Sequence, residues 1–175
     1  AINGFGALML YDDVQFSHYE IPVELYNKLT GRQKSLPKPE YAALGPNDTY
    51  YIRFADGTSQ WNGIGDDFSS YVKENEVDKV AFCADGGWFV SIEGGGFKLK
   101  GAFGDLVTKL KWPSNRKRSI ENVSLGSCGA YFVSFTDGHW IYGGPSNDQY
   151  SYNLNNLVGE MNKIGLELGL LRHVY

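Results

Sequence analysis

The stretch that decides the fold is residues 43–57, which read ALGPNDTYYIRFADG from Ala43 to Gly57. Its residues 50–54 alternate between two faces, which is the period-two pattern of a β-strand. Asp56-Gly57 follows directly, and this dipeptide between apolar segments favours a tight hairpin turn. The stretch therefore predicts a leading strand before Gly45, a second strand from Tyr50, and a hairpin into a third strand.

The same pattern returns along the chain, and repeats of this length indicate a repeat architecture. Equivalent leading strands start at residues 42, 80 and 123, so successive starts lie 38 and 43 residues apart. A fourth start follows at residue 164, while residues 7–14 align with 50–57 and lack a leading strand. We therefore divide one domain, 1–175, into units 1–41, 42–79, 80–122 and 123–163, with 164–175 completing the first unit.

Each unit also has a third strand and a short helix. The third strands are expected over 59–62, 97–100 and 140–143, and helical spacing of apolar residues follows each of them. The expected helices cover 21–29 and the neighbourhoods of Phe68, Leu106 and Leu154. The predicted fold is β-rich (α+β): four repeats of about 40 residues, closed into a ring or small propeller-like assembly by the two chain ends.

Composition excludes several classes of protein. The 175 residues include 22 Gly, and 42% are hydrophobic, which excludes disorder. The net charge of −4 argues against a nucleic-acid partner, and the basic run at 116–118 is expected to be a solvated loop. No apolar stretch approaches the roughly 18 residues of a membrane span. The expected partner is a small molecule or glycan, with no nucleic acid, no membrane and no cofactor.

The two cysteines, Cys83 and Cys128, form neither a zinc site nor a disulfide framework. The favoured interpretation is that both cysteines are structural thiols. A single disulfide between them, or a role as a nucleophile, stays open. The first residues show no signal-peptide pattern. We expect a soluble cytoplasmic protein, with secretion as the alternative.

The phrase at 43–57, together with Trp61-Asn62-Gly63, resembles tandem repeats found in many uncharacterised proteins of fungi and protists. The resemblance covers nearly the whole chain, unit by unit. It implies a repeat architecture and a eukaryotic microbial origin, and it transfers no activity and no site residue. The first unit departs from the pattern, because Asp12-Asp13-Val14 replaces the Asp-Gly turn and His18 replaces an aromatic residue or Leu.

Catalytic and metal-binding patterns are weak in this sequence. None of the three histidines has the spacing of a metal ligand, so no metal site is predicted. His18 is expected to be a mostly buried, hydrogen-bonded side chain. If the protein is an enzyme, its pocket is expected in the divergent first unit, with catalytic candidates His18, Asp12, Asp13 and Glu20.

Aromatic residues make up 15% of the chain, and rings that are not buried can stack on the apolar faces of sugars. Core packing is the competing explanation for each ring. The sequence favours a non-enzymatic, lectin-like binding protein for a carbohydrate or another small ligand. The alternatives are a small enzyme and a structural or homo-oligomerising module. The ligand-binding candidates are Tyr51, Trp61, Asn62, Trp140 and Tyr142.

Overall fold

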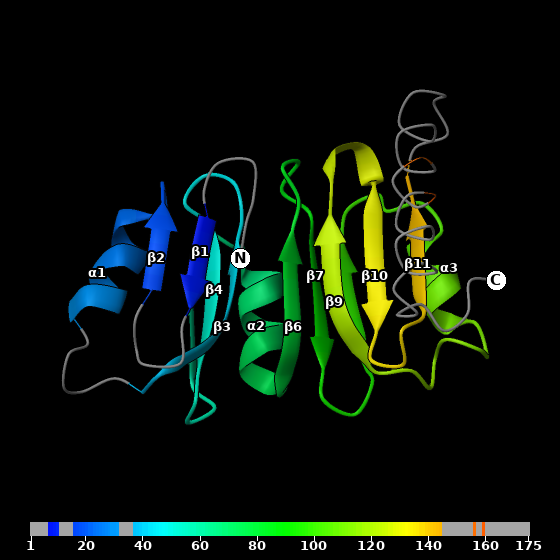
Figure 1. The fold of residues 1–175 in the computed structure, drawn as a ribbon, viewed down its shortest axis with the longest axis horizontal. Helices are drawn as coiled ribbons and strands as arrows, with labels where there is room; N and C mark the ends of the chain where they lie inside the picture. Colours follow the sequence, from blue (N-terminus) through cyan, green and yellow to red (C-terminus); the bar gives the residue numbers. More distant parts are fainter. Residues whose placement is uncertain (1–6, 11–15, 32–36, 145–155, 157–158, 160–175) are drawn as a thin grey trace.

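The computed structural model describes residues 7–10, 16–31, 37–144, 156 and 159. In this part of the chain, four antiparallel sheets follow one another in sequence order. Figure 1 shows them side by side along the longest axis, with β2 near one end of the row and β11 near the other. The β-rich class and the hairpin sheets are thus confirmed.

The first sheet has two strands, β1 (Ala7–Leu10) and β2 (Phe16–Tyr19), and helix α1 (Val23–Gly31) follows it. The other three sheets have three strands each. The second contains β3 (Pro39–Leu44), β4 (Tyr50–Phe54) and β5 (Ser59–Asn62), followed by α2 (Asp66–Glu74). The third contains β6 (Val77–Phe82), β7 (Trp88–Ile92) and β8 (Phe97–Lys100), followed by α3 (Leu106–Lys111). The fourth contains β9 (Ile120–Leu125), β10 (Tyr131–Phe135) and β11 (Trp140–Gly143), with a short 3-10 turn, η1 (Ser127–Gly129), between β9 and β10.

The three-stranded sheets repeat one hydrogen-bond pattern. Their second strands end in equivalent turns, in which the N–H groups of Gly57, Gly95 and Gly138 each donate to the carbonyl three residues earlier. Gly57 and Gly138 have φ angles of 82° and 83°, in the left-handed region that glycine adopts without strain. The predicted third strands at 59–62, 97–100 and 140–143 are confirmed.

The leading strands begin three residues before the predicted starts, at Pro39, Val77 and Ile120 instead of 42, 80 and 123. In each case one residue is skipped in the register with the second strand, which marks a β-bulge. The extra residue interrupts the period-two alternation. The prediction located each strand by that alternation, so it began each strand after the bulge. The skipped residues are all acidic: Glu40, Asp78 and Glu121.

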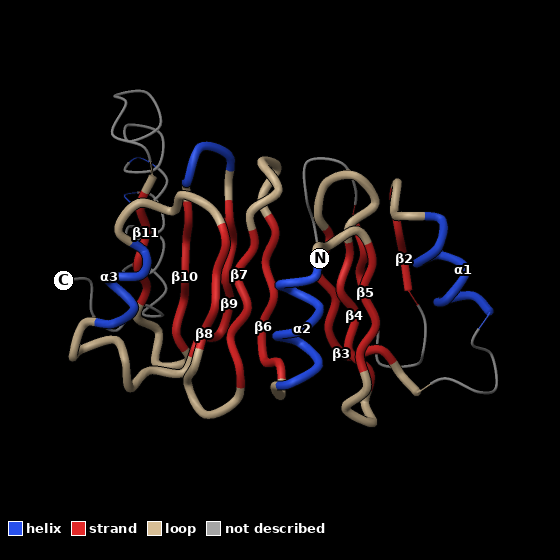
Figure 2. The backbone as a smooth tube through the Cα atoms, turned by 180° about the vertical axis from the view of Figure 1, so that it is seen from behind, coloured by secondary structure: helices blue, strands red, loops and turns tan. Residues whose placement is uncertain are grey.

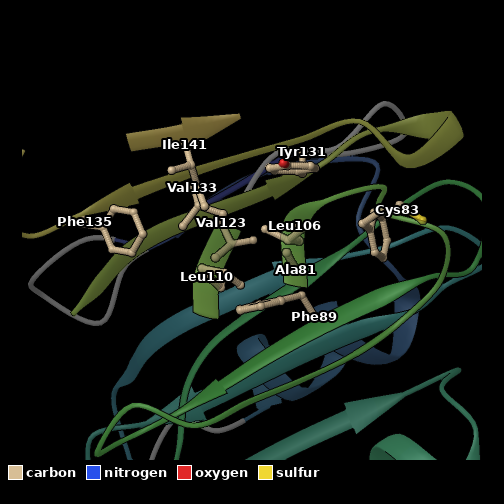
Figure 3. Close-up of a cluster of buried hydrophobic side chains, with 11 residues drawn as sticks. Ala81, Cys83, Phe89, Leu106, Leu110, Val123, Tyr131, Val133, Phe135 and Ile141 are labelled. Carbon is tan, nitrogen blue, oxygen red and sulfur yellow. The ribbon is translucent and has the colours of Figure 1, made fainter. Parts of the chain in front are cut away.

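Each helix packs between its own sheet and the next. Phe68 and Val72 of α2 share a buried cluster with Tyr51 on one side and Trp88 on the other. Figure 2 shows α2 between the sheets of β3–β5 and β6–β8. In Figure 3, Leu106 and Leu110 of α3 lie between Phe89 of one sheet and the apolar residues of the β10 sheet. The helices thus fill the space between neighbouring sheets and join them into one body.

The closed ring is not seen in the described residues, where the sheets form an open row and no closed barrel (Figures 1 and 2). The segment expected to complete the first unit, 164–175, lies outside the described residues. The same holds for Leu154 and the helix predicted around it, apart from residues 156 and 159, which are helical.

Candidate groove on the leading strands

A groove crosses the leading strands of the row. It has a volume of about 1130 Å³ and is bounded at one end by β1 and β2 and at the other by β9. β3, β6 and β9 are each the edge strand of their sheet, and they lie side by side. An edge strand presents backbone N–H and C=O groups that its own sheet does not pair. The groove therefore brings three such edges to one surface.

Short side chains keep this surface open. Several of the lining residues are small: Ala42, Ala43, Ala81, Ala84, Ser124 and Gly126. Ala43 and Ala81 are buried between the sheets, whereas Ser124 is exposed. Small residues at these places leave the backbone of the leading strands within reach of a bound molecule.

Tyr41 fixes the floor of the groove. Its hydroxyl donates to the carbonyl of Val80 at 2.6 Å and accepts from the Val80 N–H at 2.9 Å, so it caps the edge of β6. Burial raises the pKa of Tyr41 to about 12. Arg53 stacks over the Tyr41 ring at 5.7 Å and donates to the Val77 carbonyl at 2.6 Å. These bonds tie the second and third sheets together with a defined spacing.

Polar and aromatic side chains surround the floor. Tyr19 is 65% exposed, and its neighbour Glu20 raises the pKa of the phenol by hydrogen bonding and charge. Glu40 places an exposed carboxylate at the bulge of β3. At the other end, the Asn122 side chain accepts from the Val123 N–H at 3.0 Å. The rim thus carries a ring, a carboxylate and an amide.

His18 also lines the groove, and the expectation that it is mostly buried is wrong, because the side chain is exposed. It stands opposite Leu8 in the hairpin, and its ring lies 5.7 Å from Phe16 and 5.0 Å from Tyr26. The equivalent Trp61 is partly covered, because β5 has α2 over it and its indole donates to Ser69 at 3.0 Å. Burial at this position depends on the helix, which the strand pattern does not contain.

The other catalytic candidates are not gathered around His18. Glu20 follows β2 with a left-handed φ of 47°, and it does not line the groove. Asp12 and Asp13 lie outside the described residues. Among the residues that the structure describes, no group of three His, Cys, Asp or Glu side chains is placed to hold a metal ion.

The ligand-binding candidates from the sequence lie elsewhere. Tyr51 is 1% exposed, between β4 and α2. Trp61 and Asn62 belong to β5, and Trp140 and Tyr142 belong to β11, two sheets further along the row (Figure 2). None of the five lines the groove. The structure therefore does not bring them together at one site.

Trp140 and Tyr142 form part of a half-buried aromatic surface on the last sheet. The ring of Trp140 is stacked with Phe132 at 5.8 Å and lies 5.6 Å from Tyr142. Lys109 of α3 donates to the Tyr142 carbonyl at 2.7 Å and pairs with Asp105 at 3.0 Å. These contacts anchor α3 to β11.

The two cysteines are both free thiols. Cys83 is buried at the end of β6, lines the groove, and accepts from the Gly87 N–H at 3.2 Å. Cys128 is exposed in η1, where its N–H donates to the Asp85 carboxylate at 2.7 Å. The structure thus agrees with the structural-thiol reading over the disulfide.

The groove residues that the sequence did not single out include Tyr19, Glu40, Tyr41, Asn122 and Ser124. One signal could have found those on the leading strands: an acidic residue lies two positions before each predicted strand start, at residues 40, 78 and 121, and it marks the bulge and therefore the strand edge.

Neither a protein-family model nor a curated protein matches this chain. The resemblance to fungal and protist repeats therefore stays a prediction. Within the described residues, no helix has the length and hydropathy that crossing a membrane requires.

Proposed function

We propose that this protein is a non-enzymatic binding protein and that its groove takes a carbohydrate chain. One observation carries the proposal: a groove of about 1130 Å³ runs over three strand edges, and several of its lining side chains are small. Its volume is in the range of small-ligand sites and slightly above their usual size of roughly 300–1,000 Å³. An elongated, open site suits a chain of several units better than one compact molecule.

The chemistry of the lining favours a neutral, hydroxyl-rich ligand. Backbone groups, Asn122 and Ser124 can donate and accept hydrogen bonds, and the exposed ring of Tyr19 can stack on the apolar face of a sugar. Glu40 is the one carboxylate or cation among the described lining residues, so an anionic ligand is disfavoured. The small side chains let hydroxyl groups approach the strand edges.

A glycan array followed by calorimetric titration of the best neutral oligosaccharide tests the proposal. Ser124 is exposed in the groove, so Ser124→Trp should fill it and weaken binding by at least about tenfold, or 1.4 kcal/mol. Trp140→Ala, on the last sheet, is the matched control and should bind as the original protein does. Binding lost in Trp140→Ala and kept in Ser124→Trp would move the site to the aromatic surface. No binding to any glycan would overturn the proposal.

A second candidate is a small enzyme that uses the same groove, and the exposed imidazole of His18 favours it. A general base needs such an accessible position beside its substrate. His18→Ala separates the two functions, because a binding protein should keep its affinity within about twofold, whereas an enzyme should lose turnover.

We also propose a closed four-unit arrangement for the complete chain and a cytoplasmic location. Three equivalent sheets in sequence order support the first, and two free thiols fit a reducing compartment. Localisation of a tagged chain tests the second, and secretion with a Cys83–Cys128 disulfide would contradict it. A homo-oligomer is the alternative arrangement, and light scattering would reveal it.

A further inference from the structure

The end of α3 and the loop that follows it form the most positively charged stretch of the chain. Residues 109–118 contain five of the 16 lysine and arginine residues and no Asp or Glu. Lys109 is paired with Asp105 at 3.0 Å. Arg118 is paired with Asp137. The other three cationic side chains are exposed and have no hydrogen-bond or ion-pair partner among the described residues: Lys111, Arg116 and Lys117.

Hydrogen bonds hold this loop in one folded turn. The N–H groups of Asn115 and Arg116 both donate to the Trp112 carbonyl at 2.9 Å. Asn115 is 3% exposed, and its side-chain amide donates to the Lys109 carbonyl at 2.8 Å, near the end of α3. The Arg118 side chain donates to a carbonyl of the same turn at 2.8 Å. The exposed side chains of the loop are therefore presented by a preorganised support, which lowers the cost of binding a partner.

Trp112 lies among these unpaired cations. It is 49% exposed, whereas the other exposed large apolar side chains of the described residues all belong to the first unit. Figures 1 and 2 show the loop after α3 at the outer edge of the row, at the end where β11 lies. A single exposed apolar residue is common on protein surfaces. Here Lys111 precedes the ring in the chain and Arg116 follows it by one turn, so an apolar ring and positive charges share one small surface.

An apolar ring bordered by cations at an outer edge suits a flat, anionic lipid surface. Trp is enriched at membrane–water interfaces, and Lys and Arg beside a membrane are attracted to anionic headgroups. Single-stranded nucleic acid is the other polyanion to compare, and proteins bind it in grooves where several rings stack on successive bases. This loop offers one exposed ring, and Trp112 does not line the groove on the leading strands. The combination therefore favours a lipid surface over a nucleic-acid strand.

We propose that residues 111–117 form a contact site for membranes that contain anionic phospholipids. Trp112 enters the headgroup region, and the three unpaired cations lie against the lipid phosphates and carboxylates. The proposal revises the sequence-based expectation of a chain without a membrane partner. The attachment is reversible, because stable anchoring takes two strong signals and one ring with three cations is weaker than that. The site lies apart from the groove, so this inference and the carbohydrate proposal can fail separately.

Co-sedimentation of the full chain with lipid vesicles tests the proposal. The vesicles contain phosphatidylcholine alone or phosphatidylcholine with phosphatidylserine, at roughly 0.05 M and 0.5 M salt. The protein should bind the phosphatidylserine vesicles at low salt and leave them at high salt, because salt screens the attraction between exposed charges. Phosphatidylcholine vesicles should bind it at least about tenfold more weakly at low salt.

Two double variants locate the contact. Lys111→Glu with Lys117→Glu should weaken binding to the phosphatidylserine vesicles by at least about tenfold, since both attractions are reversed. Lys73→Glu with Lys100→Glu is the matched control, because it makes the same change in net charge at exposed positions of α2 and β8. Lys73 also lies in the last turn of α2 as Lys111 does in α3, so both variants remove a cation from a helix end. The control should bind within about threefold of the original protein.

The ring is tested by Trp112→Ala, which should weaken vesicle binding by about fivefold or more, because the apolar surface that enters the headgroup region is lost. Several results would overturn the proposal. They are no binding of the original protein to the phosphatidylserine vesicles at low salt, equal binding to both kinds of vesicle, and equal losses in the two double variants. A single-stranded oligonucleotide that binds through Lys111 and Lys117 while the vesicles do not would assign the loop to nucleic acid instead.

Discussion

The middle and the end of the row carry the same aromatic column in different environments. Tyr51 on β4 and Phe89 on β7 are 1% and 0% exposed, whereas the equivalent Phe132 on β10 is only half-buried. In the middle, α2 or α3 and a further sheet cover the column. At the end, Phe132 stacks instead on Trp140 of its own sheet.

This difference shows that the repeat pattern specifies which face is apolar and that the neighbouring unit decides how deeply it is buried. A ring pressed between sheets has contacts on every side, and its removal leaves a cavity. A ring on a terminal face is covered on one side, and its removal exposes little new surface to water. The same substitution should therefore have unequal effects at the two places.

The largest expected effect is that of Phe68→Ala in α2. Phe68 is 0% exposed and lies 5.3 Å from Trp88 and 5.8 Å from Phe82, ring centre to ring centre. Its loss should lower the free energy of unfolding by about 3–5 kcal/mol, since the cavity lies between two sheets. Phe132→Ala, the control at the end of the row, should cost less than about 2 kcal/mol. Urea unfolding followed by fluorescence measures both, and equal losses would remove the contrast between middle and end.

The sequence was sufficient to predict those strands whose ends are set by a local turn. The third strands and the turns at Gly57 and Gly138 follow from alternation and from the Asp-Gly dipeptide, so their positions were confirmed. The leading strands were placed three residues late, because the bulges at Glu40, Asp78 and Glu121 break the alternation. Local periodicity cannot reveal a strand that continues beyond an extra residue.

The site was harder to predict, because it depends on contacts between units. Tyr51 was a ligand candidate because an unburied ring can stack on a sugar, yet α2 covers this ring, and its neighbour Arg53 donates to the Val77 carbonyl. Tyr41 was not a candidate, and its partner Val80 is 39 residues away in the chain. Neither the covering helix nor this pairing can be inferred from one unit alone.

An intermediate effect is expected at the junction of β3 and β6. Tyr41→Phe removes the hydroxyl that bonds both the N–H and the C=O of Val80, and it leaves the ring. Loss of stability of about 1–3 kcal/mol should result, because the edge of β6 loses its polar partner. Tyr26→Phe, on the 40% exposed ring of α1, is the control and should change stability by less than about 0.5 kcal/mol. Chemical unfolding of both variants gives the comparison, and a neutral Tyr41→Phe would show that water replaces the hydroxyl.

The smallest expected effect is a change in alkaline sensitivity caused by the buried Tyr41 hydroxyl. Burial raises the pKa of Tyr41 to about 12, while a tyrosine in the unfolded chain ionises near 10. Between these values the unfolded chain has lost the proton and the folded chain keeps it, so stability is full below pH 10 and falls as the pH rises toward 12. Burial also raises the pKa of Tyr51 and, on the last sheet, of Tyr131, so part of the slope is shared, and Tyr41 adds at most about 1.4 kcal/mol per pH unit. Unfolding in urea at pH 9, 10 and 11 should give a shallower slope for Tyr41→Phe than for Tyr26→Phe. Parallel slopes would mean that the Tyr41 hydroxyl is hydrated, and the middle of the row would then be as open to water as its end.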